Sequence, residues 1–173
     1  PDLRGLLSPA EADAIVDHCL ERGANLTLIH HGDADPSTTH QINITFADAV
    51  GSDDALVMAR AIQLFAPGLP QIYYLGLLAG RNDHAGVGET GELRAINRSN
   101  FGLDDVRSRL RRPVVERQLD LIRRRSDAPA FAGVLAEVDQ PTESSLRITW
   151  VNGEHRASLT ADVVAHTVDL AWS

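Results

Sequence analysis

Apolar residues recur at helical spacing in three parts of the chain. The first part follows Ser8 to Glu11, which has the form of a capping box with proline at the first helical position, and it ends before Gly23. The second part begins after Ser52, where two aspartates occupy the first turn, and the third covers about residues 112–125. These patterns predict three amphipathic helices. The residues expected to form the buried stripe of the second helix are Leu56, Ala59, Ile62 and Phe65.

Other segments have the pattern of strands. Pro67 and Gly68 should end the second helix, and the apolar run from Gln71 to Leu78 then has the composition of a strand buried on both faces. Such a strand delivers the loop that follows it to the ligand-binding end of an α/β fold. Earlier in the chain, residues 38–46 alternate between apolar and polar side chains and predict an extended segment that can point His40 or Gln41 into a cleft.

After Phe131 the pattern becomes typical of antiparallel β-structure. Apolar residues alternate on both sides of Asn152-Gly153, which favours a hairpin with a two-residue turn, and residues 168–172 predict one more strand. We therefore expect a domain boundary near Phe131, with a small antiparallel sheet beyond it.

Composition narrows the classes of protein that this chain can represent. The formal net charge is −8, with a pI near 5.2, which argues against a general nucleic-acid or anionic-membrane binder. No apolar run is long enough to span a membrane, and the N-terminal residues lack the pattern of a signal peptide. The single cysteine, Cys19, excludes an internal disulfide and suits a reducing compartment. A soluble cytoplasmic protein is expected.

Two motifs invite a cofactor or metal interpretation, and both are weak. Residues 30–40 contain three histidines and two aspartates, but their spacing matches neither a zinc pair on one helix face nor an EF-hand. The glycines of residues 86–91 match a dinucleotide-binding fingerprint, but the segment does not join a strand directly to a helix. We expect polar loops at both places, and the sequence indicates no cofactor and no metal.

Three segments together carry a resemblance to a known family. They are residues 60–83, with Pro-Gly-Leu-Pro-Gln-Ile-Tyr-Tyr-Leu-Gly-Leu-Leu-Ala-Gly at their centre, residues 94–98 and residues 112–115. The chain resembles the sucrose phosphorylase group of the α-amylase superfamily, glycoside hydrolase family 13. The first part of the central run is typical of the whole superfamily, whereas Leu-Leu-Ala-Gly-x-Asn-Asp and Ile-Asn-Arg narrow the similarity to the phosphorylase group.

The resemblance implies an α/β plus β fold class: the C-terminal part of a (β/α)8 TIM barrel followed by a small antiparallel β domain. Residues 1–50 would be a helix and active-site loop region inserted after barrel strand seven, residues 51–130 the last helix-strand-helix of the barrel, and residues 131–173 the β domain. Gln71 to Leu75 would form the eighth strand. The missing N-terminal barrel portion of the same enzyme would then be the chain's main partner, and a homo-oligomer is compatible with this arrangement.

The family's reaction is a retaining double displacement that uses an aspartate nucleophile, a glutamate acid/base and a second aspartate. All three precede this segment in the family, so the resemblance implies no catalytic residue here, no cofactor, and inactivity of the chain on its own. It does imply substrate contacts. Arg94 matches the arginine that hydrogen-bonds the glucosyl unit, and His40-Gln41 matches a mobile loop that usually reads Tyr-Gln. His40 would contact a phosphate on the acceptor, as in the sucrose 6-phosphate branch, or merely replace the packing of the tyrosine.

The parent enzyme is therefore expected to transfer a glucosyl unit from sucrose, sucrose 6-phosphate or a related α-glucoside to inorganic phosphate. Two alternatives stay open. One is a non-catalytic sugar-binding or assembly module, because a single strand with two helices cannot close a barrel. The other is a family-13 α-glucosidase or amylosucrase-like transferase.

Overall fold

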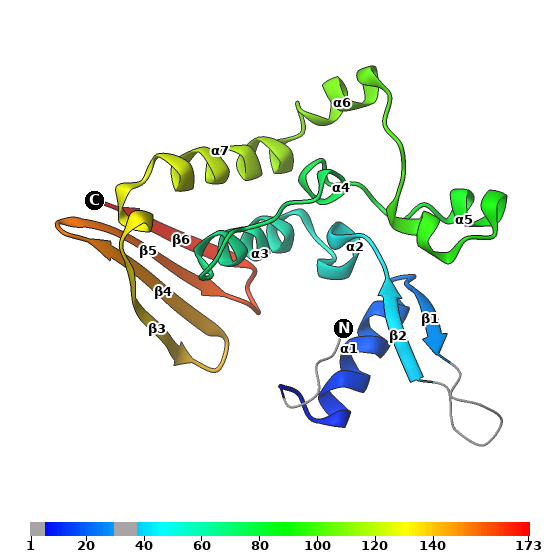
Figure 1. The fold of residues 1–173 in the computed structure, drawn as a ribbon, viewed down its shortest axis with the longest axis horizontal. Helices are drawn as coiled ribbons and strands as arrows, with labels where there is room; N and C mark the ends of the chain where they lie inside the picture. The colour runs from blue at the N-terminus through cyan, green and yellow to red at the C-terminus, as the bar shows by residue number, and fades with distance from the viewer. Residues whose placement is uncertain (1–5, 30–37) are drawn as a thin grey trace.

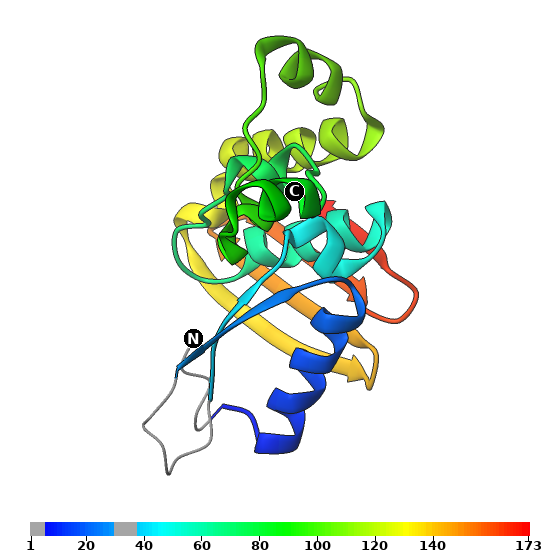
Figure 2. The ribbon, with the colours of Figure 1, turned by 90° about the vertical axis from the view of Figure 1, so that its right-hand side faces the viewer.

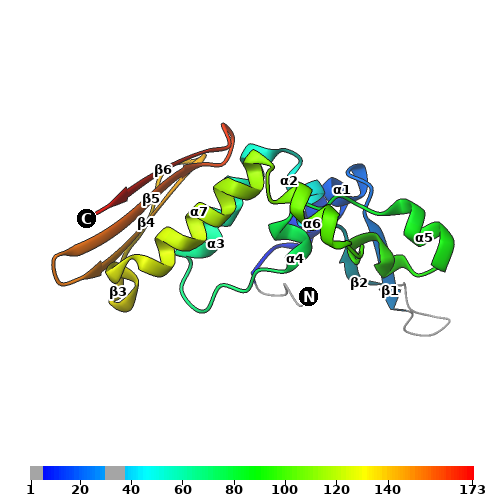
Figure 3. The same ribbon diagram turned by 90° about the horizontal axis from the view of Figure 1, so that it is seen from above.

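The computed structural model describes residues 6–29 and 38–173. In these residues the molecule is elongated, with a four-stranded sheet at one end and a small hairpin at the other (Figures 1 and 3). The N-terminal elements are α1 (Pro9–Glu21), β1 (Asn25–Ile29), β2 (Thr38–Asn43), α2 (Phe46–Val50) and α3 (Asp53–Phe65). The central elements are α4 (Tyr74–Leu77), α5 (His84–Thr90), η1 (Leu93–Asn97), α6 (Leu103–Arg109) and α7 (Pro113–Asp127). The C-terminal elements are η2 (Pro129–Ala132), β3 (Val134–Thr142), β4 (Ser145–Asn152), β5 (His155–Asp162) and β6 (Thr167–Trp172).

All three predicted helices are confirmed as α1, α3 and α7. In α1 the Ser8 backbone N–H donates to the Glu11 carboxylate at 2.7 Å and the Glu11 N–H donates to Ser8 Oγ at 3.3 Å, so the capping box is reciprocal. Helix α3 has Ser52 as its N-cap, as predicted. It ends at Phe65 because Pro67 disfavours helical ψ at Ala66, which is extended with ψ 147°.

The buried stripe of α3 is wider than predicted. Leu56 and Phe65 are fully buried, whereas Ala59 and Ile62 are only half-buried. The helix is covered from two sides, by α7 and by strands β4, β5 and β6, so one narrow stripe cannot describe it. The additional buried apolar side chains of α3 are Ala55, Val57, Met58, Ala61 and Leu64.

The four strands β3 to β6 form an antiparallel sheet in sequence order, and α3 lies against it (Figure 1). Phe65 joins the two layers: its ring meets that of Phe131 edge-on at 5.0 Å, and its carbonyl accepts the Trp150 indole N–H at 2.7 Å. The predicted hairpin of β4 and β5 and the last strand, β6, are confirmed. The turn is displaced by one residue, because Asn152 pairs with His155 and leaves Gly153-Glu154 as the loop, with Gly153 at φ +60°.

The predicted strand from Gln71 to Leu78 is wrong in this structure. Residues 71–73 are extended but pair with no strand among the described residues, and Tyr74–Leu77 instead form the single turn α4. A parallel strand needs hydrogen-bonded neighbours on its edges, and the described part of the chain offers none. The turn is held by α7, where Gln118 Nε2 donates to the Leu77 carbonyl at 3.0 Å.

Between the sheet end and the hairpin, short elements replace the loops that the sequence predicts. The glycine-rich segment forms helix α5, capped by Asp83, so it has no dinucleotide-binding geometry. The predicted extended segment at residues 38–46 is confirmed as far as Asn43, where β2 ends, and its partner β1 was missed. Helix α6 projects at one edge of the molecule and α1 at the opposite edge (Figure 2). No helix in the described part of the chain combines the length and the apolar character needed to cross a membrane.

Candidate substrate-binding site

The hairpin of β1 and β2 carries the predicted pair His40-Gln41. Gln41 pairs with Thr27 and Thr39 pairs with Leu28, so His40 is the extra residue of a β-bulge. The His40 side chain is exposed, whereas Gln41 is half-buried and its Oε1 has no hydrogen-bond partner among the described residues. A buried acceptor without a donor is costly, which marks Gln41 Oε1 as a group suited to receive a ligand's hydrogen bond.

Arg94 lies on the short helix η1, and other residues of that helix anchor it to the rest of the chain. Ile96 is fully buried, its carbonyl accepts the Asp83 N–H at 2.9 Å, and Asn97 Nδ2 donates to the Ile44 carbonyl at 3.3 Å. These contacts fix the backbone of η1 against the start of α5 and the end of β2. The Arg94 side chain is exposed and forms no ion pair with any residue that the structure describes.

Gln41 and Arg94, 53 positions apart in the sequence, line one polar hollow of about 530 Å³. None of its lining side chains is a carboxylate, and two are guanidinium groups. It therefore offers hydrogen-bond donors and positive charge, which suit a hydroxylated or anionic ligand, but no carboxylate acid/base pair. His40 is not among the lining residues. The residues that line the hollow are Gln41, Asn43, Tyr73, Tyr74, Arg94, Asn97, Arg98 and Asn100.

Two tyrosines form the aromatic wall of the hollow. The rings of Tyr73 and Tyr74 lie 4.5 Å apart, and the Tyr74 hydroxyl donates to the Ser99 carbonyl at 2.7 Å. The side-chain hydrogen bond with Tyr73 is the main cause that raises the pKa of Tyr74, and partial burial and the neighbouring phenol add to it. Sequence reasoning did not assign these residues to a site. Tyr73 and Tyr74 lie inside the run that the sequence predicts as a strand, so the pattern gave no signal that they line a site.

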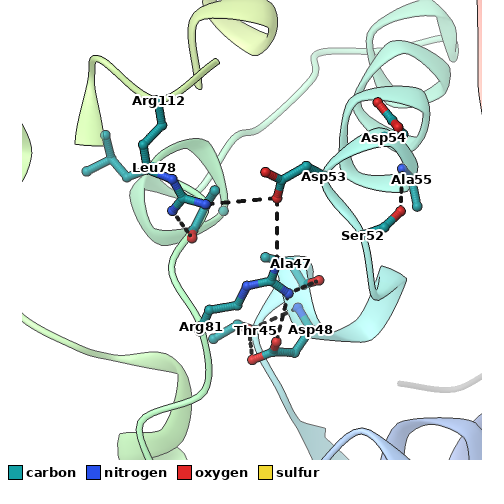
Figure 4. Close-up of polar contacts among 12 residues, drawn as sticks. Thr45, Ala47, Asp48, Ser52, Asp53, Asp54, Ala55, Leu78, Arg81 and Arg112 are labelled. Atoms are coloured by element: carbon teal, nitrogen blue, oxygen red, sulfur yellow. Dashed lines mark hydrogen bonds and ion pairs between the residues drawn. The ribbon is translucent and has the colours of Figure 1, made fainter. Parts of the chain in front are cut away.

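A polar cluster around Asp48 ties α2 to the segment that leads into α5 (Figure 4). Asp48, in α2, accepts from Arg81 Nη1 at 2.9 Å, from the Asn82 N–H at 2.5 Å and from Thr45 Oγ1 at 3.1 Å. Asn82 Oδ1 in turn accepts the Thr45 N–H at 2.9 Å. The cluster therefore ties the end of β2 to the segment that leads into α5 and η1. We call these four residues, Thr45, Asp48, Arg81 and Asn82, the Asp48 cluster.

The arginines of residues 107–125 do not form a nucleic-acid surface. Arg109 and Arg112 donate to the carbonyls of Leu78 and Ala79 at 3.3 and 3.0 Å, and Arg125 donates to the carbonyl of Leu64 at 3.3 Å. Asp120 and Arg124, four positions apart on α7, form an exposed ion pair at 2.7 Å. These side chains therefore join helices to one another instead of presenting a continuous basic face.

The metal interpretation finds no support in the residues that the structure describes, where no group of three histidine, cysteine, aspartate or glutamate side chains could hold an ion. Residues 30–37, which contain most of the candidate ligands, lie outside the described part of the chain. Cys19 is buried, and burial raises the pKa of its thiol, which fits a structural role in α1.

Comparison with known proteins gives a consistent set of relatives. The chain is 43% identical over 175 residues to the sucrose 6(F)-phosphate phosphorylase of Thermoanaerobacterium thermosaccharolyticum, covering 98% of this chain and 36% of the relative. It is 38% identical to the glucosylglycerol phosphorylase of Marinobacter adhaerens, covering 100% of this chain and 36% of that protein. No family model matches.

A solved structure shares the fold. The crystal structure of sucrose 6F-phosphate phosphorylase from Thermoanaerobacter thermosaccharolyticum superposes with a TM-score of 0.92 and 41% identity, over 99% of this chain and 36% of that one. The match confirms the predicted fold class, the C-terminal part of a barrel followed by an antiparallel β domain. The chain spans about a third of the length of the relatives that it matches.

Proposed function

We propose that this chain, which belongs to the sucrose phosphorylase group of the α-amylase superfamily (glycoside hydrolase family 13) and corresponds to the C-terminal part of its members, supplies substrate contacts to a glucosyl-transferring phosphorylase. The whole enzyme moves a glucosyl unit from an α-glucoside to inorganic phosphate. The bond from the anomeric carbon to the hexose oxygen breaks, and a bond from that carbon to a phosphate oxygen replaces it.

One observation carries the proposal: the polar hollow joins Gln41 and Arg94 and contains no carboxylate. In this account Arg94 donates charge-assisted hydrogen bonds to the glucosyl unit, each contributing on the order of 1.5–3 kcal/mol. Gln41 offers its Oε1, which lacks a partner among the described residues, to a hydroxyl of the bound sugar. The nucleophile and the acid/base come from the part of the enzyme that precedes this segment in its relatives, so the chain alone is inactive.

The proposal also specifies a class of substrate. The relatives include sucrose 6(F)-phosphate phosphorylases at 43% and 41% identity. The family resemblance also implies that His40 replaces the tyrosine that is usual in sucrose phosphorylases. His40 is exposed and precedes Gln41, which lines the hollow, and in this proposal its imidazole contacts a phosphate group on the acceptor hexose. We therefore place a phosphorylated acceptor, as in sucrose 6-phosphate, ahead of free fructose.

The test uses the full-length enzyme with four substrates in parallel: sucrose, sucrose 6-phosphate, glucosylglycerate and glucosylglycerol. The proposal predicts release of α-glucose 1-phosphate that depends on inorganic phosphate, fastest with sucrose 6-phosphate. Hydrolysis to free glucose at a rate that phosphate does not change would contradict it and indicate a glucosidase. Failure of all four substrates would indicate a non-catalytic module.

A further inference from the structure

A second pocket, separate from the polar hollow in its chemistry, lies over a buried arginine. Arg60 of α3 has only 3% of its surface exposed and lines a pocket of about 440 Å³. Burial is the cause that lowers the pKa of its guanidinium to about 10. A buried charge is costly unless a charged partner and hydrogen bonds compensate it, so the surroundings of this group are informative.

The partners of Arg60 within the described residues are all neutral. Its Nε donates to Gln118 Oε1 at 3.0 Å, and its Nη1 donates to Gln63 Oε1. Gln118 is held in this orientation because its Nε2 donates to the Leu77 carbonyl. The guanidinium also lies 4.9 Å from the centre of the Phe46 ring. In residues 6–29 and 38–173, no carboxylate comes within 4.0 Å of Arg60 and Nη2 has no acceptor.

The pocket is lined in part by the segment that the family resemblance assigns to the last barrel strand. Gln71, Tyr73 and Leu75, spaced two residues apart, line the pocket together with Arg60. Gln71 and Tyr73 belong to the extended residues 71–73, which pair with no strand in the described chain, and Leu75 lies in α4. A closed barrel covers both edges of every strand, and the relatives are nearly three times as long as this chain. Chain from outside this segment is therefore available to cover the pocket.

The guanidinium group of Arg60 also lies in a space that a residue larger than glycine at position 76 would restrict. A Cβ atom added to Gly76 would lie 3.2 Å from Arg60 Nη2, so glycine is the residue that lets the head group reach the pocket wall. Arginine presents its donors as a planar fork that matches a carboxylate in two parallel hydrogen bonds. The neutral partners occupy Nε and Nη1, which leaves the Nη2 edge for that contact.

We propose that this pocket receives a carboxylate side chain from the part of the enzyme outside this chain, and that the carboxylate forms a buried ion pair with Arg60. The pair would lock the helix α3 to the preceding barrel. This inference rests on family membership and not on the substrate contacts proposed above, because it concerns assembly of the fold.

The experiment compares the melting temperature of the full-length enzyme and its Arg60→Met variant between about pH 7.5 and about pH 5. Removal of the arginine leaves the carboxylate buried and unpaired, which raises its pKa, so it becomes protonated as the pH falls and the penalty disappears. In the wild type, the ion pair is present at pH values above the ordinary carboxyl pKa. The deficit in melting temperature should therefore be large at pH 7.5 and fall by half or more at pH 5.

A deficit that stays constant with pH would overturn the proposal. The groups that face Arg60 from α2, α3, α4 and α7 are Phe46, Gln63, Gly76 and Gln118, and none of them has an ionisable side chain. The described lining also includes the phenol of Tyr73, but no carboxyl or imidazole group. The matched control is Arg125→Met, because Arg125 also meets a carbonyl and an aromatic ring. Its deficit should not change over this pH range.

Two further outcomes decide the remaining cases. If inorganic phosphate raises the melting temperature of the wild type but not of Arg60→Met, the pocket binds a free anion and the proposal is wrong. If Arg60→Met does not fold, a crystal structure of the wild-type full-length enzyme decides, since the proposal requires a carboxylate oxygen from the preceding chain within about 4 Å of Arg60. Both readouts are independent of phosphorolysis, so this inference and the proposed function can fail separately.

Discussion

The two ends of this molecule are held together by different forces. At the sheet end, α3 and the strands β4 to β6 share one apolar core, with Phe65 between the rings of Phe131 and Trp172. At the hairpin end, side chains bonded to distant backbone groups hold the elements together, and the Asp48 cluster is the main example (Figure 4). Apolar packing is non-directional and supplies stability, whereas buried polar contacts fix geometry.

This difference indicates that the two ends of the molecule have different roles. Under the proposed function, the sheet end serves as a scaffold and the hairpin end carries the residues proposed to contact the substrate. Changes at the two ends should therefore separate in experiment. Changes at the sheet end should lower stability and leave the kinetics normal. Changes at the hairpin end should alter the kinetics with a smaller loss of stability.

The largest loss of stability is expected from Phe65→Ala in the full-length enzyme. Phe65 is 1% exposed, and truncation of a buried phenylalanine typically costs about 3–5 kcal/mol through lost transfer energy and the cavity that remains. Chemical denaturation should measure this loss, while kcat/KM of the folded fraction stays close to that of the wild type. Val164→Ala, an exposed position in the last turn of the sheet, is the control and should change stability by less than about 0.5 kcal/mol. Equal effects of the two changes would contradict the scaffold role.

A smaller loss of stability, with a clear kinetic effect, is expected from Asp48→Ala. The change removes the acceptor for Arg81, for the Asn82 N–H and for Thr45 Oγ1. Water can replace part of these contacts, because the side chains of Asp48 and Arg81 are 20% and 45% exposed, so the net loss should stay below that of Phe65→Ala, at about 1–3 kcal/mol. Displacement of β2 relative to η1 should lower kcat/KM for phosphorolysis. Asp104→Ala, which breaks only the exposed pair with Arg107, is the matched control. Stability lost with kcat/KM intact would show that the Asp48 cluster supports only the fold.

The smallest effect is expected from His40→Tyr. His40 is exposed on a bulge and outside the lining of the hollow, so the change should leave stability within about 0.5 kcal/mol. The ratio of kcat/KM for sucrose 6-phosphate to that for sucrose should fall by about tenfold, equivalent to about 1.4 kcal/mol. If that ratio does not move, His40 only replaces the packing of the usual tyrosine.

The sequence predicted the sheet end better than the hairpin end, for a physical reason. Helices α3 and α7 and strands β4 to β6 carry their periodicity locally, because each has an apolar face toward one core. The strand expected at Gln71 to Leu78 failed because a parallel strand is defined by its neighbours, and the described chain lacks them. Apolar composition alone cannot distinguish that strand from the turn α4.

The site was predicted in part. Arg94 and Gln41 were named from the resemblance, and the structure brings them to one hollow. Their roles stay a proposal. Tyr73, Tyr74 and Arg98 were missed as lining residues, because their shared position depends on contacts such as Asn97 to the Ile44 carbonyl, which leave no periodic signal. Arg60 was also missed, because its place on a helix pattern does not reveal burial among neutral groups.

The most direct test of the division between scaffold and substrate contact is the kcat/KM of Arg94→Ala in the full-length enzyme. Arg94 is exposed and forms no ion pair in the described residues, so its loss should not change the melting temperature. We predict a fall in kcat/KM of about 10- to 150-fold, which corresponds to about 1.5–3 kcal/mol of lost hydrogen bonding to the glucosyl unit. Arg123→Ala, an exposed arginine of α7, should have no effect on either quantity. An unchanged kcat/KM for Arg94→Ala would contradict the account.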